Sequence, residues 1–302
     1  MNDLQIDYEK GRVLADLLYM AFQSNGIHGQ TVMPEDLIPN GITQGSREHL
    51  LFITLTVAID YQRDAMALWN SSRRSFEDPD TRYLFEPAEV ARVPAAQITR
   101  DMKKYGLSKK PDQDAFIWTT AAVSFHKKYN NDPRNLLENC GYKADSILET
   151  LRSGKHLNNG RYVWDFPYLR GNKIGPLWVR MLRDNLGYDM KNMDLIPIPV
   201  DIHVARATMA LGVVRGKYEG PIDELYTYIR EAWFQSVKGL VRPDGLPMIA
   251  LDVDEPLWHL SRSGCSKRQG NDYCPMKNTC LCQKYCIPGM IEIDSTKGKS
   301  YI

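Results

Sequence analysis

The sequence lacks any stretch of about 18 consecutive apolar residues, which excludes an ordinary membrane-spanning helix. Its first residues, MNDLQIDYEKGRVLADLL, contain no basic segment followed by an apolar one. We therefore expect no secretory signal and a cytoplasmic location. A charge excess is also lacking, because 38 Lys and Arg residues face 37 Asp and Glu residues and leave a net charge of +1. The overall charge therefore gives no indication of nucleic-acid binding, and local motifs must decide the function.

Helical periodicity runs through nearly the whole chain. Leu14, Leu17, Leu18 and Phe22, for example, lie at the spacing of one helix face. The extended run at residues 195–200 contains prolines and leads into a helix, so we interpret it as a connection and not as a central strand. We expect an all-α fold whose C-terminal tail frays, with helices near residues 6–23, 47–70, 94–106, 112–129, 143–153, 173–187, 201–212, 221–237 and 255–263.

Glycines mark a turn within WDFPYLRGNKIGPLWVRML, residues 164–182. The turn from Arg170 through Gly171 and Asn172 to Gly175 separates an aromatic segment from an amphipathic helix. Glycine permits positive φ and close approach of the backbone, and amides at the start of a helix attract an anion. The turn can therefore hold a DNA phosphate without reading sequence. Taken alone, the turn is a weak signal, and an ordinary connection between helices explains it.

Asp201 follows the proline-bearing run in IPIPVDIHVARATMALG, residues 196–212, and opens the next helix. Aspartate is among the best N-capping residues, so a purely structural role would explain it. A capping aspartate can also face a ligand, and the two interpretations are compatible.

Together, the two stretches resemble the helix-hairpin-helix superfamily of DNA glycosylases. Its endonuclease III branch has a Leu-Pro-Gly-x-Gly-x-Lys-Thr-Ala hairpin, then Val-Asp-Thr-His and an Arg shortly after. Here Val200, Asp201, His203 and Arg206 match the second motif, whereas Gly171 and Gly175 are four residues apart where the family has two. The resemblance implies base excision from DNA, with Gly171, Gly175, His203 and Arg206 among the DNA-binding residues, together with Arg170 and Asn172.

The resemblance also implies the catalytic residues. Asp201 would stabilise positive charge on the sugar as the glycosidic bond breaks. Lys173 takes the position of the family's nucleophilic lysine if the motif is anchored on Gly171, and Leu177 takes it if the anchor is Gly175. The first anchoring is also similar to archaeal 8-oxoguanine glycosylases, which carry a comparable lysine and an Ile-Pro-Val-Asp run. With Lys173 as nucleophile the enzyme can also nick the strand; otherwise Lys173 is solvated or contacts a phosphate.

Five of the six cysteines lie between residues 265 and 286, which in a cytoplasmic protein indicates a metal site. The remaining Cys140 is expected to be a buried thiol. Endonuclease III-like glycosylases bind a 4Fe–4S cluster through C-x6-C-x2-C-x5-C. That resemblance implies Cys265, Cys274, Cys280 and Cys286 as ligands, with Cys282 as the alternative to Cys280. Structural zinc is the alternative to the cluster.

The base pocket is implied by the helix expected at residues 47–70. In the family, residues midway along it face the flipped base, and here these are Ile59, Asp60, Tyr61 and Gln62. Asp60 and Tyr61 can hydrogen-bond and stack on a base. Alternatively, Tyr61 packs in the core and Asp60 lies on the surface.

The resemblance implies two helical lobes around a cleft: a six-helix barrel at residues 45–190 that ends in the hairpin, and a lobe of residues 1–44 and 191–302 with the cluster loop. We expect a nucleoid-associated monomer that binds double-stranded DNA with a damaged or modified base. The alternatives are a non-catalytic DNA-binding or redox-sensing module, a zinc-stabilised protein-binding domain, and a glycosylase acting on RNA or a nucleoside. The excised base is not predicted.

Overall fold

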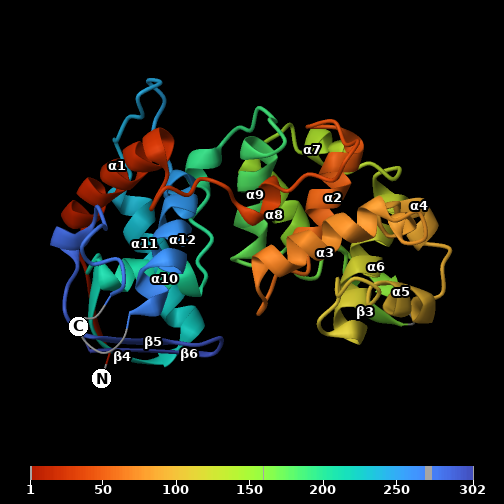
Figure 1. Ribbon diagram of the computed structural model, residues 1–302. Coiled ribbons are helices and arrows are strands. Elements are labelled where there is room, and N and C mark those ends of the chain that lie inside the picture. Colours follow the sequence, from red (N-terminus) through yellow and green to blue (C-terminus); the bar gives the residue numbers. More distant parts are fainter. Residues whose placement is uncertain (1, 159, 269–273, 302) are drawn as a thin grey trace. The chain divides into compact units, whose positions relative to one another are not determined.

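The computed structural model describes residues 2–158, 160–268 and 274–301, and helices dominate it (Figure 1). The α-helices of the described residues are α1 (Tyr8–Asn25), α2 (Arg47–Val57), α3 (Ala65–Glu77), α4 (Pro87–Val90), α5 (Ala95–Asp101), α6 (Pro111–Lys128), α7 (Arg134–Asn139), α8 (Ala144–Ser153), α9 (Ile174–Asp184), α10 (Ile202–Ala210), α11 (Ile222–Ser236) and α12 (Asp254–Ser263). The strands are β1 (Asp3–Ile6), β2 (Lys155–Asn158), β3 (Arg161–Trp164), β4 (Val214–Pro221), β5 (Met290–Ile293) and β6 (Lys297–Tyr301). None of the described helices is long and apolar enough to cross a membrane.

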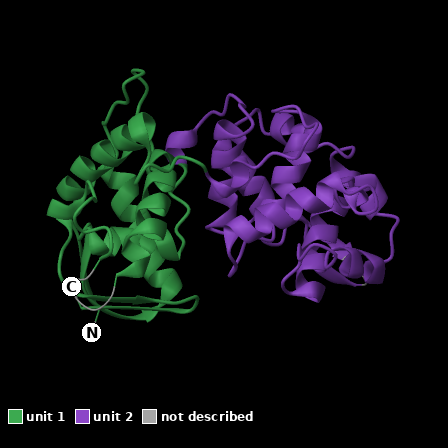
Figure 2. Ribbon diagram, viewed as in Figure 1, with its two compact units in different colours: residues 1–32, 196–302 green, residues 33–195 purple. Residues whose placement is uncertain are grey.

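The chain forms two compact units (Figure 2). Unit 1 comprises residues 1–32 and 196–302, and unit 2 comprises residues 33–195. The sequence placed the corresponding boundaries at residues 45 and 190. Unit 1 therefore combines the two ends of the chain, and it contains the Asp201 segment and the five clustered cysteines.

Unit 1 packs α1, α10, α11 and α12 with an antiparallel sheet of strand order β1-β4-β6-β5. Burial alternates along β4, so that Val214 and Tyr218 face the apolar core. β4 also approaches β1 closely at Gly216, where a Cβ atom would lie 1.8 Å from the carbonyl oxygen of Asp3. Gly216 has φ +125°, and both constraints require glycine.

Unit 2 contains α2 to α9 around a core of aromatic rings. Phe52 packs against Trp69, Phe76 and Phe85, and Trp118 packs edge-on against Phe85. Buried tryptophans need a partner for the indole N–H, and the Trp118 indole donates to the Leu84 carbonyl at 2.7 Å. Between α8 and α9, β2 and β3 form an antiparallel hairpin. This hairpin directly precedes the turn that the sequence singled out.

The predicted, mainly helical fold is confirmed, and the structure corrects three details. The helix expected at residues 47–70 is interrupted, because α2 ends at Val57 and α3 begins at Ala65. The tail after Gly289 is ordered as β5 and β6 and does not fray, since its backbone pairs within the sheet. The β2–β3 hairpin and the four-stranded sheet were not expected. Residues 195–200 contain no strand, as predicted.

Candidate active site and nucleic-acid interface

Asp201 caps α10, as the sequence predicted. Its Oδ1 atom accepts hydrogen bonds from the backbone amides of His203 at 2.7 Å and Val204 at 2.9 Å. The side chain is half-buried, and its backbone is extended at the end of the proline-bearing run. Because both amides bind Oδ1, the cap fixes the carboxylate without engaging Oδ2. Asp201 is therefore an oriented, partly exposed negative charge.

Tyr226 and His203 of unit 1 lie near this cap. Burial, with the nearby Asp201 carboxylate as a further cause, raises the pKa of Tyr226. His203 lies edge-on to Trp258, with ring centroids 5.8 Å apart, and its Nδ1 atom is 3.5 Å from the Ser261 hydroxyl. Asp201 therefore has two polar aromatic side chains nearby, Tyr226 and His203.

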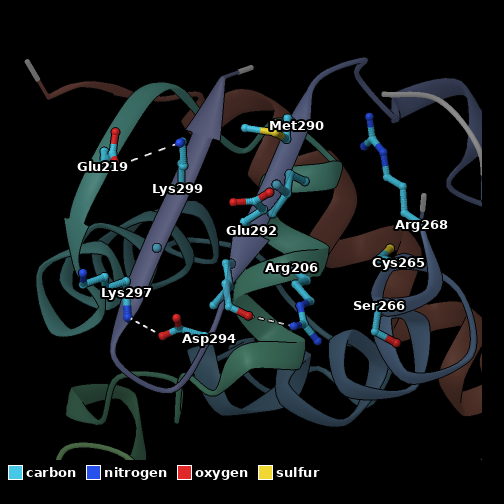
Figure 3. Close-up of a pocket in the computed structure, with 13 residues that line it drawn as sticks. Arg206, Glu219, Cys265, Ser266, Arg268, Met290, Glu292, Asp294, Lys297 and Lys299 are labelled. Atoms are coloured by element: carbon cyan, nitrogen blue, oxygen red, sulfur yellow. Dashed lines mark hydrogen bonds and ion pairs between the residues drawn. The ribbon is translucent and has the colours of Figure 1, made fainter. Parts of the chain in front are cut away.

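Arg206 is directed toward the sheet of unit 1. Its guanidinium donates to the carbonyl oxygen of Ile293 in β5 at 2.7 Å. It lines a cavity of about 690 Å³, beside which Lys299 pairs with Glu219 and Asp294 binds Lys297 (Figure 3). In this structure Arg206 therefore ties α10 to the C-terminal strands, and its predicted DNA contact stays a prediction.

The glycine turn (residues 170–175) joins the end of β3 to α9 in unit 2. Neither Gly171 nor Gly175 has positive φ, so neither glycine is needed here for a left-handed backbone. Their small size matters for a different reason. A Cβ atom on Gly175 would lie 2.7 Å from the Leu169 carbonyl oxygen and 2.9 Å from the Leu148 side chain. Gly175 therefore permits close packing of α9 against α8.

Lys173 occupies the N-cap position of α9. Its side chain is half-buried, and Nζ lies 3.4 Å from the backbone carbonyl oxygen of Asp60. The amine thus sits at the positive end of a helix, beside the α2–α3 connection. This contact brings the predicted nucleophile and the predicted pocket segment together.

The four predicted pocket residues lie on this α2–α3 connection and not midway along a helix. Ile59 is fully buried and Asp60 is 7% exposed, whereas Gln62 is exposed and has φ 49°. Tyr61 stacks on Tyr168, with ring centroids 4.3 Å apart and an interplanar angle of 23°. The connection is therefore fastened to the segment that precedes the glycine turn.

Asp114 organises the neighbourhood of Tyr61. It accepts a hydrogen bond from the Tyr61 hydroxyl at 2.9 Å and from the backbone amides of Lys109 and Lys110, each at 2.8 Å. Burial, together with Asp114, raises the pKa of Tyr61. The Lys110 ammonium lies 4.8 Å from the Tyr61 ring centroid and binds the Gln62 side chain. The Tyr61 ring is thus held between a tyrosine and a lysine.

Arg170 stacks on the β2–β3 hairpin. Its guanidinium carbon lies 3.7 Å from the Trp164 ring centroid, and its Nη2 is 3.4 Å from the Arg152 carbonyl oxygen. Arg152 in turn contacts the Asn172 side chain at 3.3 Å. Unit 2 therefore gathers cations around the glycine turn, and Trp164 supports one of them.

Four of the five clustered cysteines line one cavity of unit 1, of about 330 Å³: Cys265, Cys274, Cys280 and Cys286. Cys282 does not line it and is fully buried in the core. Residues 269–273 of the predicted cluster loop lie outside the described residues. Among the described residues, no three His, Cys, Asp or Glu side chains converge as a site for a single metal ion.

The cysteines that line this cavity are of the residue type that the implied cofactor needs, and the cofactor itself stays a prediction. Four thiolates are the usual ligands of a 4Fe–4S cluster. Zinc would draw four sulfurs to about 2.3 Å from one point, which needs little volume. The four thiols share a cavity of about 330 Å³ with eight other residues, so they lie near one another without closing around a single point. Arg268 and Lys277 also line it and supply positive charge near the thiolates.

Sequence reasoning missed Tyr168, Asp114 and the pair Lys109 and Lys110, because their roles depend on contacts between distant segments. It also missed the β2–β3 hairpin, although a signal was present. Residues 159–160 are Asn-Gly, and the flanking residues alternate in the manner of a hairpin. The alternating Tyr162 and Trp164 would have drawn attention to this element.

Comparison with protein-family models found no match, and a search of curated proteins found none either. Among solved structures, the chain shares the fold of endonuclease III and related glycosylases. A non-covalent endonuclease III–DNA complex aligns with a TM-score of 0.52 at 15% identity, over 93% of this chain and 96% of that chain. A trapped covalent endonuclease III–DNA intermediate aligns at 0.54 and 16%, over the same shares. A thermostable thymine-DNA glycosylase aligns at 0.52 and 14%, over 92% of this chain and 95% of that one. The chain therefore has an endonuclease III-like fold.

Proposed function

We propose that this protein is a DNA glycosylase, which turns a damaged or modified nucleotide out of a duplex and cleaves its N-glycosidic bond. The observation that carries the proposal is Asp201, a helix-capping carboxylate that two backbone amides hold by one oxygen while the side chain stays partly exposed. The endonuclease III-like fold supports the proposal, since its solved relatives are DNA glycosylases.

The chemistry requires a fixed negative charge beside the sugar. Cleavage of the glycosidic bond leaves the electron pair with the base and positive charge on the sugar. A carboxylate that is already oriented stabilises this charge without reorganisation during the reaction. The hydrogen bonds to His203 and Val204 provide that orientation for Asp201.

Lys173 is the candidate nucleophile. As the neutral amine, its nitrogen can form a bond to C1′ of the sugar while the base leaves with the electron pair of the glycosidic bond. Loss of the amine protons and opening of the bond between C1′ and the ring oxygen, which takes up a proton, then give a Schiff base that permits strand nicking. Its position at the N-terminus of α9 supports the role, because Nζ lies 3.4 Å from the Asp60 carbonyl oxygen, in the predicted pocket segment. One of the similar structures is a trapped covalent endonuclease III–DNA intermediate. If Lys173 is not the nucleophile, water attacks and only the base is released.

Unit 2 supplies the groups that would hold DNA. The side chains of Asn172, which is exposed, and of Lys173, at the start of α9, are the groups of the glycine turn that would contact a phosphate. Two further cations lie near this turn: Lys110 lies over the Tyr61 ring, and Arg170 lies over the Trp164 ring. We propose that the α2–α3 connection, held beside the turn, contacts the nucleotides around the flipped base.

A 4Fe–4S cluster bound by Cys265, Cys274, Cys280 and Cys286 completes the proposal. When bound, the cluster would cross-link the C-terminal loop and provide no chemistry at the base. Its ligands come from residues on both sides of 269–273, so binding would restrain that part of unit 1. Arg268 and Lys277, which line the same cavity, would then be held near the cluster and could attract DNA electrostatically over a distance.

The experiment is a mass-spectrometric screen for free bases. The purified holoprotein is incubated with duplexes carrying damaged, mismatched or naturally modified bases, beside the Asp201→Asn and Lys173→Gln variants. We expect release of one class of base by the wild type and its loss in Asp201→Asn. Loss of strand nicking in Lys173→Gln would assign the nucleophile. No release from any duplex by a protein with a full complement of iron and sulfide would reject the proposal.

A further inference from the structure

The β2–β3 hairpin exposes one apolar face. Its register pairs Lys155 with Trp164 and Leu157 with Tyr162, so these four side chains lie on the same face of the ribbon. Leu157 is 64% exposed, Tyr162 is 72% exposed and Trp164 is 40% exposed. Isolated two-stranded ribbons are marginally stable in water, and exposed apolar clusters usually mark a binding site.

The base of the hairpin is held in place. Asp165, which is 2% exposed, accepts hydrogen bonds from the Lys128 ammonium at 2.5 Å and from His156 Nδ1 at 2.8 Å. A Cβ atom on Gly154 would lie 2.7 Å from the Asp165 carboxylate, so the chain passes close to it. These contacts fix the ribbon on unit 2, at the end of α6, and leave its apolar face outward.

The segment that carries this apolar face, residues 152–173, has an excess of positive charge and no exposed acidic residue. Residues 152–173 contain five Lys and Arg residues, and their one acidic residue is the buried, paired Asp165. Lys155 lies over the Tyr162 ring at 4.9 Å, and Arg170 of the glycine turn lies over Trp164 at 3.7 Å. The apolar face is thus continuous with the turn proposed to bind phosphate.

We propose that the β2–β3 hairpin is a second DNA-contacting element that lays Leu157 and Tyr162 into the minor groove beside the phosphate held by the glycine turn. This inference rests on the proposed function. The charge of the segment selects a polyanion as the occupant. Leucine and tyrosine carry little hydrogen-bonding information, but apolar side chains pack on sugars and wedge between base steps of a bent duplex. The hairpin would therefore stabilise the distorted DNA without reading its sequence.

The test compares two double variants of the holoprotein. Leu157→Ser/Tyr162→Ser removes the apolar face, and Val241→Ser/Leu246→Ser removes two similarly exposed apolar residues of unit 1 as a control. Fluorescence anisotropy measures binding to a duplex with a tetrahydrofuran abasic analogue and to an unmodified duplex of the same sequence. Hydroxyl-radical footprinting then reports which minor-groove sugars are protected.

The hairpin variant should bind both duplexes at least about fivefold more weakly, given the usual contribution of one base–aromatic contact. It should also lose protection at the sugars next to the lesion, while the control variant keeps wild-type affinity and footprint. Circular dichroism should show both variants folded, since the substituted side chains are exposed.

Wild-type affinity and footprint in the hairpin variant would overturn the inference and leave the glycosylase proposal standing. A wild-type dimer in sedimentation that the hairpin variant converts to a monomer, with unchanged DNA binding, would overturn it in favour of a contact between copies. If the wild type binds neither duplex and releases no base, the proposed function fails together with the inference.

Discussion

His49 should make the stability of unit 2 depend on pH. The side chain is fully buried in α2, and its Nδ1 atom accepts a hydrogen bond from the Gly45 amide at 3.2 Å. Within the described part of the chain, its Nε2 atom has no hydrogen-bond partner. Protonation would place a charge in the core and break the bond to Gly45. Burial accordingly lowers the pKa of His49 from 6.5 to about 4.

The sign and size of the effect follow from this pKa. Between pH 6.5 and about 4 the unfolded chain binds a proton that the folded chain excludes. The contribution of His49 to stability is therefore complete above pH 6.5 and is lost as the pH falls. For one group with these two values, the free energy of unfolding should decrease by about 2 kcal/mol between pH 7 and pH 5, and by about 3 kcal/mol at pH 4.

The test uses His49→Gln, which does not titrate and retains an acceptor for the Gly45 amide. Urea unfolding of both proteins is measured between pH 5 and pH 8. Although the variant is less stable at pH 8, it should lose about 2 kcal/mol less than the wild type on acidification to pH 5. His259 in unit 1, whose burial also lowers its pKa to about 4, titrates in both proteins and cancels in the difference. Equal pH dependence in the two proteins would refute the reasoning.

Three further predictions concern the site. Asp201→Asn should abolish base release and retain stability, because asparagine can still cap α10. Asp201→Ala should abolish base release and also lower the free energy of unfolding by about 1 kcal/mol through loss of the cap. Base-release assays and urea unfolding measure the two effects. Gly175→Ala should weaken DNA binding and cost about 1–3 kcal/mol, because its Cβ atom would meet backbone at 2.7 Å, whereas Gly171→Ala, with one contact at 3.2 Å, should have the smaller effect on both. Cys280→Ala should lose iron and sulfide while Cys282→Ala retains them, and the reverse pattern in metal analysis would assign the other ligand set.

The helices could be predicted because their apolar residues recur at helical spacing. The expected helix at residues 112–129 corresponds to α6 at Pro111–Lys128, and the one at 143–153 corresponds to α8 at Ala144–Ser153. Pro111 at the first position of α6 and the glycine after α8 mark two of these ends in the sequence itself. Helix ends such as these, which are determined by residues next to them in the sequence, could therefore be predicted from the sequence.

The interruption between α2 and α3 could not be predicted in this way, because no proline or glycine lies within residues 58–64. Tertiary contacts hold the break open: Tyr61 stacks on Tyr168, more than 100 residues later, and Arg63 donates to the Leu107 carbonyl. One local signal was present, since Asp64 caps α3 by accepting from the Ala67 amide.

The candidate site divides in the same way. The capping role of Asp201 follows from its place before an apolar helix and is confirmed. The choice between Cys280 and Cys282 did not follow from spacing, because it depends on which thiol faces the cavity. The structure directs Cys280 into the cavity and Cys282 into the core. The ligand set nonetheless stays a prediction until the metal is measured.

The near-zero net charge of the chain is compatible with DNA binding because the balance is local. Asp114 receives two backbone amides and the Tyr61 hydroxyl, and Asp165 binds Lys128 and a histidine, so both carboxylates are occupied inside unit 2. Of the cations near the glycine turn, Lys110 is exposed and Arg170 is half-buried, and each lies over an aromatic ring. DNA interacts with the charges that are exposed where it binds, and not with the net charge of the whole chain. Each contact between a cation and a phosphate releases counterions from the DNA. The affinity for duplex DNA should therefore fall steeply with salt despite the net charge of +1, whereas binding that is insensitive to salt would place the contact surface elsewhere.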